Sequence, residues 1–111
     1  MRGSEFEAYL CWLFEQLGHK VINVGDTGDF GADLLTKYEG EEYVVQAKRY
    51  EANVGIEAVQ QTVGARGYYE TDKAICVTNS EYTRAAKRLA EANAVELWDR
   101  DRLIAEVNRV K

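Results

Sequence analysis

Two short runs of strand-forming residues, joined by a tight polar connection, constrain the fold of this chain more than any other segment. Strands are expected at 32–38 and at 42–49, with the Glu39-Gly40-Glu41 connection between them. Because side chains alternate between the two faces of a strand, Gln46 and Lys48 point to the same face. The segment therefore predicts a β-hairpin that carries polar side chains near the ends of its strands.

The register of this hairpin decides whether its polar side chains can meet. With Gly40-Glu41 as a two-residue loop, Leu35 lies opposite Gln46 and Asp33 lies opposite Lys48. A three-residue loop places Asp33 on the other face unless a β-bulge redirects it. A shared site thus requires Asp33 to emerge on the face that carries Gln46 and Lys48.

Gln46 and Lys48 interrupt a strand that is otherwise apolar. A buried amide without a partner costs about 1–3 kcal/mol, so such groups are expected to have partners. Asp33 follows the glycine-rich segment 25–31, which lacks the Lys-Ser/Thr ending of a phosphate-binding loop. Two interpretations stay open: a compact site of acid, amide and lysine, or an ordinary cross-strand ion pair between Asp33 and Lys48 at an exposed strand end.

The remaining apolar patterns predict helices that alternate with strands in one domain of residues 1–111. The spacing of apolar residues predicts helices at 4–17, 53–69, 80–93 and 99–110, and strands at 20–24, 73–78 and 94–98. Alternation in the second half favours parallel crossover pairing beside the antiparallel hairpin. The expected fold class is α/β, with a mixed β-sheet flanked by helices.

Individual residues mark several helix ends and faces. Ser4 and Glu7 fit a capping box, so an N-terminal capping role is one interpretation of Glu7, and Gly18 fits a helix stop. Ser80 is the expected cap of the third helix. The residues expected to be buried from the second helix are Val54, Ile56, Val59, Val63, Ala65 and Tyr68, and those from the last helix are Leu103, Ile104 and Val107.

Composition limits the kinds of partner and metal. The net charge of −5 argues against tight DNA binding by this chain alone, but not against phosphodiester chemistry in an acidic, metal-neutralised pocket. Cys11, Cys76 and the single His19 do not have zinc-site spacing, and two buried free thiols are expected. With no apolar run of about 18 residues and no signal-peptide pattern, a cytoplasmic location is expected.

Several segments are similar to one known family. Phe6-Glu7, the Gly28-Asp29-x-Gly31-x-Asp33 motif and Val45-Gln46-Ala47-Lys48-Arg49-Tyr50 resemble the Mrr-like restriction endonuclease domain of the PD-(D/E)xK superfamily. Further matches cover nearly the whole chain: Val54-Gly55, Gly64-Ala65, Val77-Thr78 and Tyr82-Thr83-x-x-Ala86. The resemblance implies an αβββαβ core, followed here by α, β and α elements. It also implies Mg²⁺-dependent cleavage of DNA, with Mn²⁺ as a substitute ion.

The resemblance also implies catalytic and metal-binding roles for individual residues. Asp33 matches the central metal-binding acid, Lys48 the family lysine and Glu7 the acid of the first helix. Gln46 stands where many relatives carry Glu or Asp and would bind the metal through a neutral amide oxygen, and Ala47 would add a backbone carbonyl to the metal ligands. The metal lowers the pKa of a bound water, and Lys48 orients the hydroxide or stabilises charge on phosphorus. Since Gln46 is neutral, we expect weak metal binding and one ion at a time.

DNA is the partner that the resemblance implies, and other functions stay open. A catalytically weak or inactive nuclease-fold module that binds DNA or protein fits the acidic pI and the neutral glutamine. A structure-specific junction resolvase shares the fold but is typically a basic dimer. Cutting both strands favours a homodimer, and target choice favours a separate DNA-recognition domain in a longer protein. Candidate phosphate contacts are Lys37, Arg49, Arg66, Arg84, Lys87 and Arg88.

Overall fold

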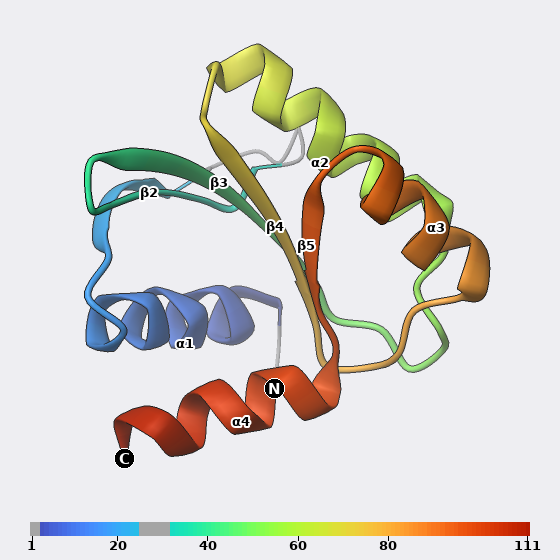
Figure 1. The fold of residues 1–111 in the computed structure, drawn as a ribbon. Coiled ribbons are helices and arrows are strands. Elements are labelled where there is room, and N and C mark those ends of the chain that lie inside the picture. The colour runs from blue at the N-terminus through green and yellow to red at the C-terminus, as the bar shows by residue number, and fades with distance from the viewer. Residues whose placement is uncertain (1–2, 25–31) are drawn as a thin grey trace.

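The computed structural model describes residues 3–24 and 32–111 of the chain. In these ranges the elements follow the predicted order (Figure 1). They are α1 (Gly3–Gln16), β1 (Lys20–Val24), β2 (Leu34–Tyr38), β3 (Glu41–Lys48), α2 (Ile56–Tyr69), β4 (Lys73–Thr78), α3 (Arg84–Ala92), β5 (Val95–Trp98) and α4 (Arg100–Val110).

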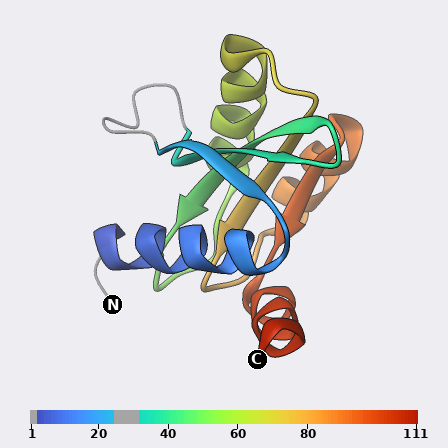
Figure 2. The ribbon, with the colours of Figure 1, turned by 90° about the vertical axis from the view of Figure 1, so that its left-hand side faces the viewer.

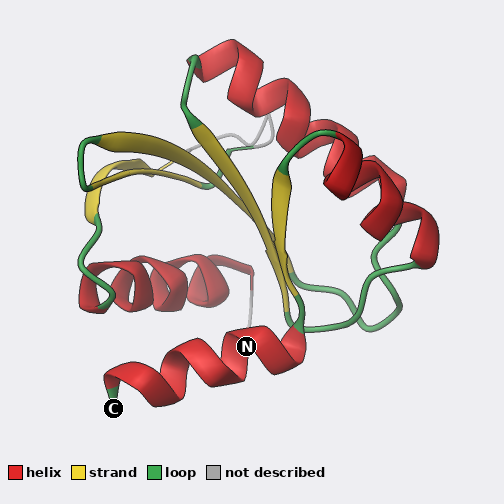
Figure 3. Ribbon diagram, in the orientation of Figure 1, coloured by secondary structure: helices red, strands yellow, loops and turns green. Residues whose placement is uncertain are grey.

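The five strands form one mixed sheet in the order β1-β2-β3-β4-β5 (Figure 3). β2 is antiparallel to both β1 and β3, whereas β3, β4 and β5 are mutually parallel. The α/β class and the mixed, helix-flanked sheet are therefore confirmed. Because the parallel strands run the same way, their carboxyl ends meet at one edge of the sheet, beside the start of β2. That side of the sheet is the carboxyl edge.

Helices cover both faces of the sheet (Figures 1 and 2). α1 and α4 lie on one face, over a core that includes Leu10, Leu13 and Phe14 of α1. α2 and α3 lie on the other face, over a core that includes Val59, Cys76 and Ala86. Burying such aliphatic and aromatic side chains contributes about 1.5–3 kcal/mol each, which fixes both helix layers against the sheet.

The hairpin between β2 and β3 turns at Glu39 and Gly40, which have φ values of 50° and 83°. A two-residue turn of this kind favours positive φ at both positions, and glycine takes the second without strain. The expected Gly40-Glu41 loop is therefore wrong by one residue, and Leu35 lies opposite Val44 rather than opposite Gln46. The observed pairing of β2 with β3 differs from the predicted one by two residues. Because two is an even number, the residues of both strands keep the faces of the sheet that were predicted for them.

Other helix boundaries also differ from the predictions. α3 begins at Arg84, and its cap is Thr83, whose hydroxyl accepts a hydrogen bond from the Ala86 N–H at 3.1 Å. The expected cap, Ser80, instead donates its hydroxyl to the Ala52 carbonyl at 3.0 Å. α1 ends as expected, with Gly18 just beyond it at a φ of 99°. Among the described residues, no helix combines the length and apolar character that crossing a membrane requires.

Both cysteines are free thiols, as predicted. Cys76 is buried beneath α2 and α3, whereas Cys11 is only half-buried beside α4. The expectation of burial is thus met at one cysteine and only in part at the other.

Candidate active site

The predicted site residues gather at the carboxyl edge of the sheet. β3 ends at Lys48, which is paired with Thr78 at the end of β4. Asp33 stands directly before β2 at the same edge, and its backbone N–H donates to the Val45 carbonyl at 2.9 Å. The first turns of α1 bring Glu7 to this edge. Three separate elements thus deliver Glu7, Asp33 and Lys48 to one region.

Asp33 is held by the backbone of β3. Its Oδ2 accepts a hydrogen bond from the Ala47 N–H at 2.7 Å. Because Ala47 and Lys48 are consecutive, this bond fixes the carboxylate beside the end of the strand that carries the lysine. The hydrogen bond connects residues 14 positions apart and is short, as expected for a charged acceptor.

Glu7 and Asp33 form a carboxylate pair. Burial raises the pKa of Glu7, and the negative charge of Asp33 and a hydrogen bond between the two side chains raise it further. Like charges this close disfavour simultaneous ionisation unless a cation lies between them. The capping box expected at Ser4 and Glu7 does not fit α1, because the helix begins at Gly3 and Ser4 lies inside it.

Gln46 points under α2, where two side chains take up its amide. It is only 3% exposed. Its Nε2 donates to Gln61 Oε1 at 2.8 Å, and the Thr62 hydroxyl donates to Gln46 Oε1. Thr62 Oγ1 also lies 2.8 Å from the Ala58 carbonyl, although a hydroxyl has one proton.

Rotating both amides by 180° resolves this competition. Gln46 then donates to the Thr62 oxygen, Thr62 donates to Ala58, and Gln61 donates to Gln46. In either orientation both ends of the Gln46 amide are occupied by α2. The metal-ligand role of Gln46 stays a prediction, and the structure adds a second role, in which Gln46 ties the end of β3 to α2.

Lys48 is half-buried and stands near the buried thiol of Cys76. Burial is the main cause that raises the pKa of Cys76, while the charge of Lys48 lowers it and that of Asp33 raises it. Both charges therefore act at the same part of the sheet. In the described part of the chain no ion pair within 4.0 Å joins Asp33 to Lys48, so the simple cross-strand ion pair is not observed.

The donor set of this region suits a hard divalent cation. Mg²⁺ prefers oxygen ligands, commonly one or two carboxylates with several retained waters. Glu7 and Asp33 provide two carboxylates, and the Ala47 carbonyl is the predicted third oxygen. Within residues 3–24 and 32–111 no group of three or more His, Cys, Asp or Glu side chains is arranged so that it could hold a metal ion by itself. Gly28, Asp29 and Gly31 of the family motif lie outside the described residues.

Two residues play roles that the sequence did not indicate. Thr62 is fully buried, and its hydroxyl is hydrogen-bonded to the Gln46 amide. The sequence feature that could have indicated this role is the position of Thr62 on the apolar face of α2, three residues after Val59. The second residue is the half-buried His19. Its Nδ1 lies 2.9 Å from the Thr36 hydroxyl, its ring stacks on Tyr38, and burial lowers its pKa.

Comparison with known proteins shows the family to which the chain belongs. The Mrr_cat family, described as restriction endonuclease, matches residues 1–107. The chain belongs to this restriction endonuclease family. A curated member, the type IV methyl-directed restriction enzyme EcoKMrr of Escherichia coli K12, is 31% identical over 110 residues, covering 91% of this chain. The match spans 36% of that enzyme, so the chain corresponds to about a third of it.

Solved structures share the fold at lower sequence identity. The MspJI restriction endonuclease, in complex with a 27-mer oligonucleotide, has a TM-score of 0.69 and 21% identity, covering 94% of this chain and 27% of that one. The DNA modification-dependent restriction endonuclease AspBHI has a TM-score of 0.62 and 15% identity over 95% of this chain and 30% of its own. The protein of unknown function AF1548 has a TM-score of 0.72 and 16% identity, covering 84% and 55%.

Proposed function

We propose that this chain is the catalytic domain of a metal-dependent endonuclease that hydrolyses phosphodiester bonds in DNA. The observation that carries the proposal is the Glu7–Asp33 carboxylate pair at the sheet edge where Lys48 ends β3. Membership of the restriction endonuclease family supports the same reaction class. A paired acid beside a lysine combines a cation site with a positive charge for the phosphate.

Each residue has a distinct task in this proposal. Glu7, Asp33 and the Ala47 carbonyl hold Mg²⁺, which Mn²⁺ can replace. The bound ion supplies a water of lowered pKa and offsets negative charge on the phosphate. The Ala47 N–H keeps the Asp33 carboxylate oriented at 2.7 Å. Lys48 faces the phosphate and stabilises the charge that develops during attack.

Gln46 acts in this scheme chiefly by positioning. Its amide is anchored by Gln61 and Thr62, so the β3 backbone at Ala47 and Lys48 is held in place from the side of α2. Because Gln46 adds no charge, the pocket carries two carboxylates, which suits a single divalent ion.

The decisive experiment is plasmid nicking in Mg²⁺ compared with EDTA. Wild-type protein is expected to nick in Mg²⁺ only, and both Asp33→Asn and Lys48→Met are expected to abolish nicking. Lys73→Met and Glu91→Gln, which alter exposed residues at the amino end of β4 and on α3, are matched controls and should retain activity. Undiminished nicking by both site variants contradicts the proposal.

A non-cleaving nuclease-fold module is the second candidate. It is favoured by the hydrogen bonds that join the Gln46 amide to Gln61 and Thr62 of α2. With this amide engaged, the side chains in the described part of the site that can bind a metal are the two acids Glu7 and Asp33. Such a module binds DNA without cutting it in either Mg²⁺ or Mn²⁺. Binding together with intact plasmid in both metals selects this candidate over the nuclease.

Two further partners follow from the reaction. Cleavage of both strands requires two active sites, so we propose that the chain cuts as a homodimer. Linear plasmid should then form a larger share of the product as the protein concentration rises. Because the chain spans 36% of its curated relative, a separate domain for target recognition in a longer protein is also proposed.

A further inference from the structure

A groove of about 620 Å³ adjoins the candidate active site on the α1 and α4 face. Its lining includes Phe6 and Tyr9 of α1, Arg100 and Leu103 of α4, and Arg49 and Asn79 from the ends of β3 and β4. Phe6 precedes Glu7, and Arg49 follows Lys48. The groove is therefore lined by the chain neighbours of two candidate site residues, and its size suits a nucleotide-sized group.

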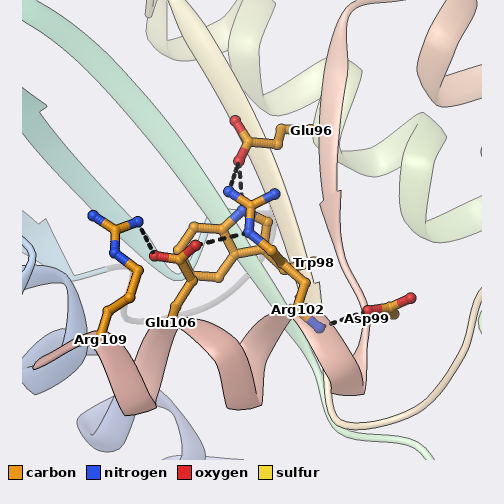
Figure 4. Close-up of polar contacts among 6 residues, drawn as sticks. All are labelled: Glu96, Trp98, Asp99, Arg102, Glu106 and Arg109. Atoms are coloured by element: carbon orange, nitrogen blue, oxygen red, sulfur yellow. Dashed lines mark hydrogen bonds and ion pairs between the residues drawn. The ribbon is translucent and has the colours of Figure 1, made fainter. Parts of the chain in front are cut away.

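The two arginines of this groove are free to bind an anion. Across the described residues, neither Arg49 nor Arg100 has a carboxylate within 4.0 Å. In contrast, Arg102 and Arg109 of the same helix α4 are both paired with Glu106, at 2.9 and 2.8 Å (Figure 4). The adjacent Asp99 carboxylate is also engaged, because it accepts the Arg102 N–H at 2.8 Å.

Hydrogen bonds between loops hold these arginines at fixed backbone positions. The Tyr50 N–H, next to Arg49, donates to Asn79 Oδ1 at 2.9 Å. The Arg100 N–H donates to the Ser80 carbonyl at 2.9 Å, and the Ser80 hydroxyl donates to the Ala52 carbonyl. The Asn79-Ser80 dipeptide thus connects the segments that carry both arginines. Their backbone is ordered before any ligand binds, which lowers the entropic cost of binding.

We propose that this groove binds the DNA strand next to the scissile phosphate. Arg49 and Arg100 contact backbone phosphates, and Tyr9 and Ile104, the more exposed apolar side chains of the lining, contact the sugar and base between them. Guanidinium groups match phosphate geometry, and an aromatic ring such as that of Tyr9 can stack on an unpaired base. The inference rests on the proposed nuclease function and identifies which surface guides the strand into the site.

The competing surface is the exposed basic side of α3, on the opposite face of the sheet. Arg84, Lys87 and Arg88 are exposed there, also without a carboxylate within 4.0 Å in the described part of the chain. That surface is not among the groove residues and does not adjoin Glu7. Arg88 is therefore a matched control of the same residue type, charge and exposure.

The test measures the salt dependence of binding to a fluorescent duplex with a single-stranded overhang, in EDTA to prevent cleavage. Each arginine–phosphate contact contributes about 0.9 to the slope of log affinity against log salt, so raising salt from about 50 to about 200 mM costs about 3.5-fold per contact. Arg49→Gln and Arg100→Gln are each expected to lower the slope by about 0.9, whereas Arg88→Gln leaves it unchanged. Arg100→Lys, which keeps the charge, should retain the slope, and thermal melting checks that all variants fold.

Each outcome decides the proposal. A slope lowered by Arg88→Gln but not by the groove variants overturns it, as does a wild-type protein without measurable affinity at about 50 mM salt. Normal cleavage by the wild type together with unchanged slopes in the groove variants contradicts DNA binding by the groove but agrees with the nuclease function. Lowered slopes in the groove variants, without any cleavage by the wild type in Mg²⁺, support DNA binding by the groove and contradict the nuclease function.

Discussion

The two ends of the α1 and α4 face use arginine in different ways. At the carboxyl edge, Arg49 and Arg100 line a groove of about 620 Å³ and are unpaired within the described chain. At the other end, a smaller hollow of about 160 Å³, here called the closed hollow, is lined by His19, Glu96, Trp98, Arg102, Glu106 and Arg109, among others. Figure 4 shows its arginines directed at carboxylates.

Sequence spacing along α4 explains this difference. Glu106 lies four residues after Arg102 and three before Arg109, which are the distances that bring side chains together on a helix. The positions three and four residues after Arg100 are Leu103 and Ile104, so no acid of its own helix faces it. Arg102 also bonds Glu96 at 3.0 Å and lies over the Trp98 ring. Neutralised arginines stabilise the fold, and unpaired ones are available to a ligand.

The largest expected effect separates the chemistry of the two ends. Lys48→Met removes the positive charge proposed to face the phosphate, so single-turnover cleavage should fall by at least about 100-fold. Arg109→Met removes a cation from the closed hollow and should change the rate by less than about twofold, because that charge acts on stability. Equal losses in both variants would break the distinction between the two ends.

A change at Thr62 tests whether the α2 anchor belongs to the catalytic end. Thr62→Val removes the hydroxyl that meets the buried Gln46 amide, so the free energy of unfolding should drop by about 1–3 kcal/mol. Cleavage should fall as well, because the end of β3 loses its support. Thr62→Ser keeps the hydroxyl and is the control. Urea denaturation gives the stability, and a Thr62→Val protein with full activity would contradict the positioning role.

The closed hollow is expected to respond in stability alone. Glu106→Gln leaves Arg102 and Arg109 without their shared carboxylate, but both arginines reach solvent and Arg102 keeps Glu96. We therefore expect a loss of about 1 kcal/mol in the free energy of unfolding. Glu91→Gln, an exposed acid on α3, should cost almost nothing. A cleavage defect in Glu106→Gln at full stability would assign the hollow a catalytic role.

The smallest effect concerns the pH dependence of the carboxylate pair. Because folding raises the pKa of Glu7, its protonated form stabilises the fold below the usual glutamate pKa, and this contribution is lost as pH rises through the folded pKa. At neutral pH, Glu7→Gln should therefore be slightly more stable than the wild type. Its free energy of unfolding should be higher by less than about 1 kcal/mol, because solvent screens the pair. In acid, the two proteins should be equally stable.

Added Mg²⁺ gives this last prediction its control. The ion should stabilise the wild type more than Glu7→Gln, because it binds both carboxylates in one protein and a single one in the other. Melting temperatures measured across pH, with and without Mg²⁺, provide the comparison. A wild type that is more stable than the variant at neutral pH without metal would show that the two acids do not repel each other.

Most of the fold could be predicted because it depends on local patterns. β4 was expected at residues 73–78 and lies at Lys73–Thr78, because a continuous apolar run marks a central strand. The end of the first helix predicted near Gly18 is confirmed, because α1 ends at Gln16. The faces of the helices were harder to predict: Ile56, Tyr68 and Ile104 are exposed. α2 begins at Ile56, and Val54 is buried before it through a bridge to Tyr82, which shifts the buried side to Ala58 and Thr62.

The candidate site could be predicted only in part. The resemblance named Glu7 and Asp33, and in the structure the charge of Asp33 is one of the causes that raise the pKa of Glu7. Alternation along β3 gave the face of Gln46 but not the helix that covers it, because that depends on long-range packing. Arg100 was absent from the predicted phosphate contacts for a similar reason. Only the packing of α1 against α4 turns the first residue of a helix into the wall of a groove.

The two-residue turn at Glu39 and Gly40 gives the site an order of assembly during folding. Hairpins with such short turns form in about 1–10 μs, and this one alone brings Asp33 to the backbone of Ala47. Glu7 and Thr62 belong to α1 and α2, so they reach the site only when these helices dock on the sheet, whose parallel β3–β4 pairing closes a long loop. A hairpin without the docked helices would thus carry the aspartate beside the lysine without the second acid. Affinity for a divalent cation is then a property of the completed fold, acquired when α1 docks.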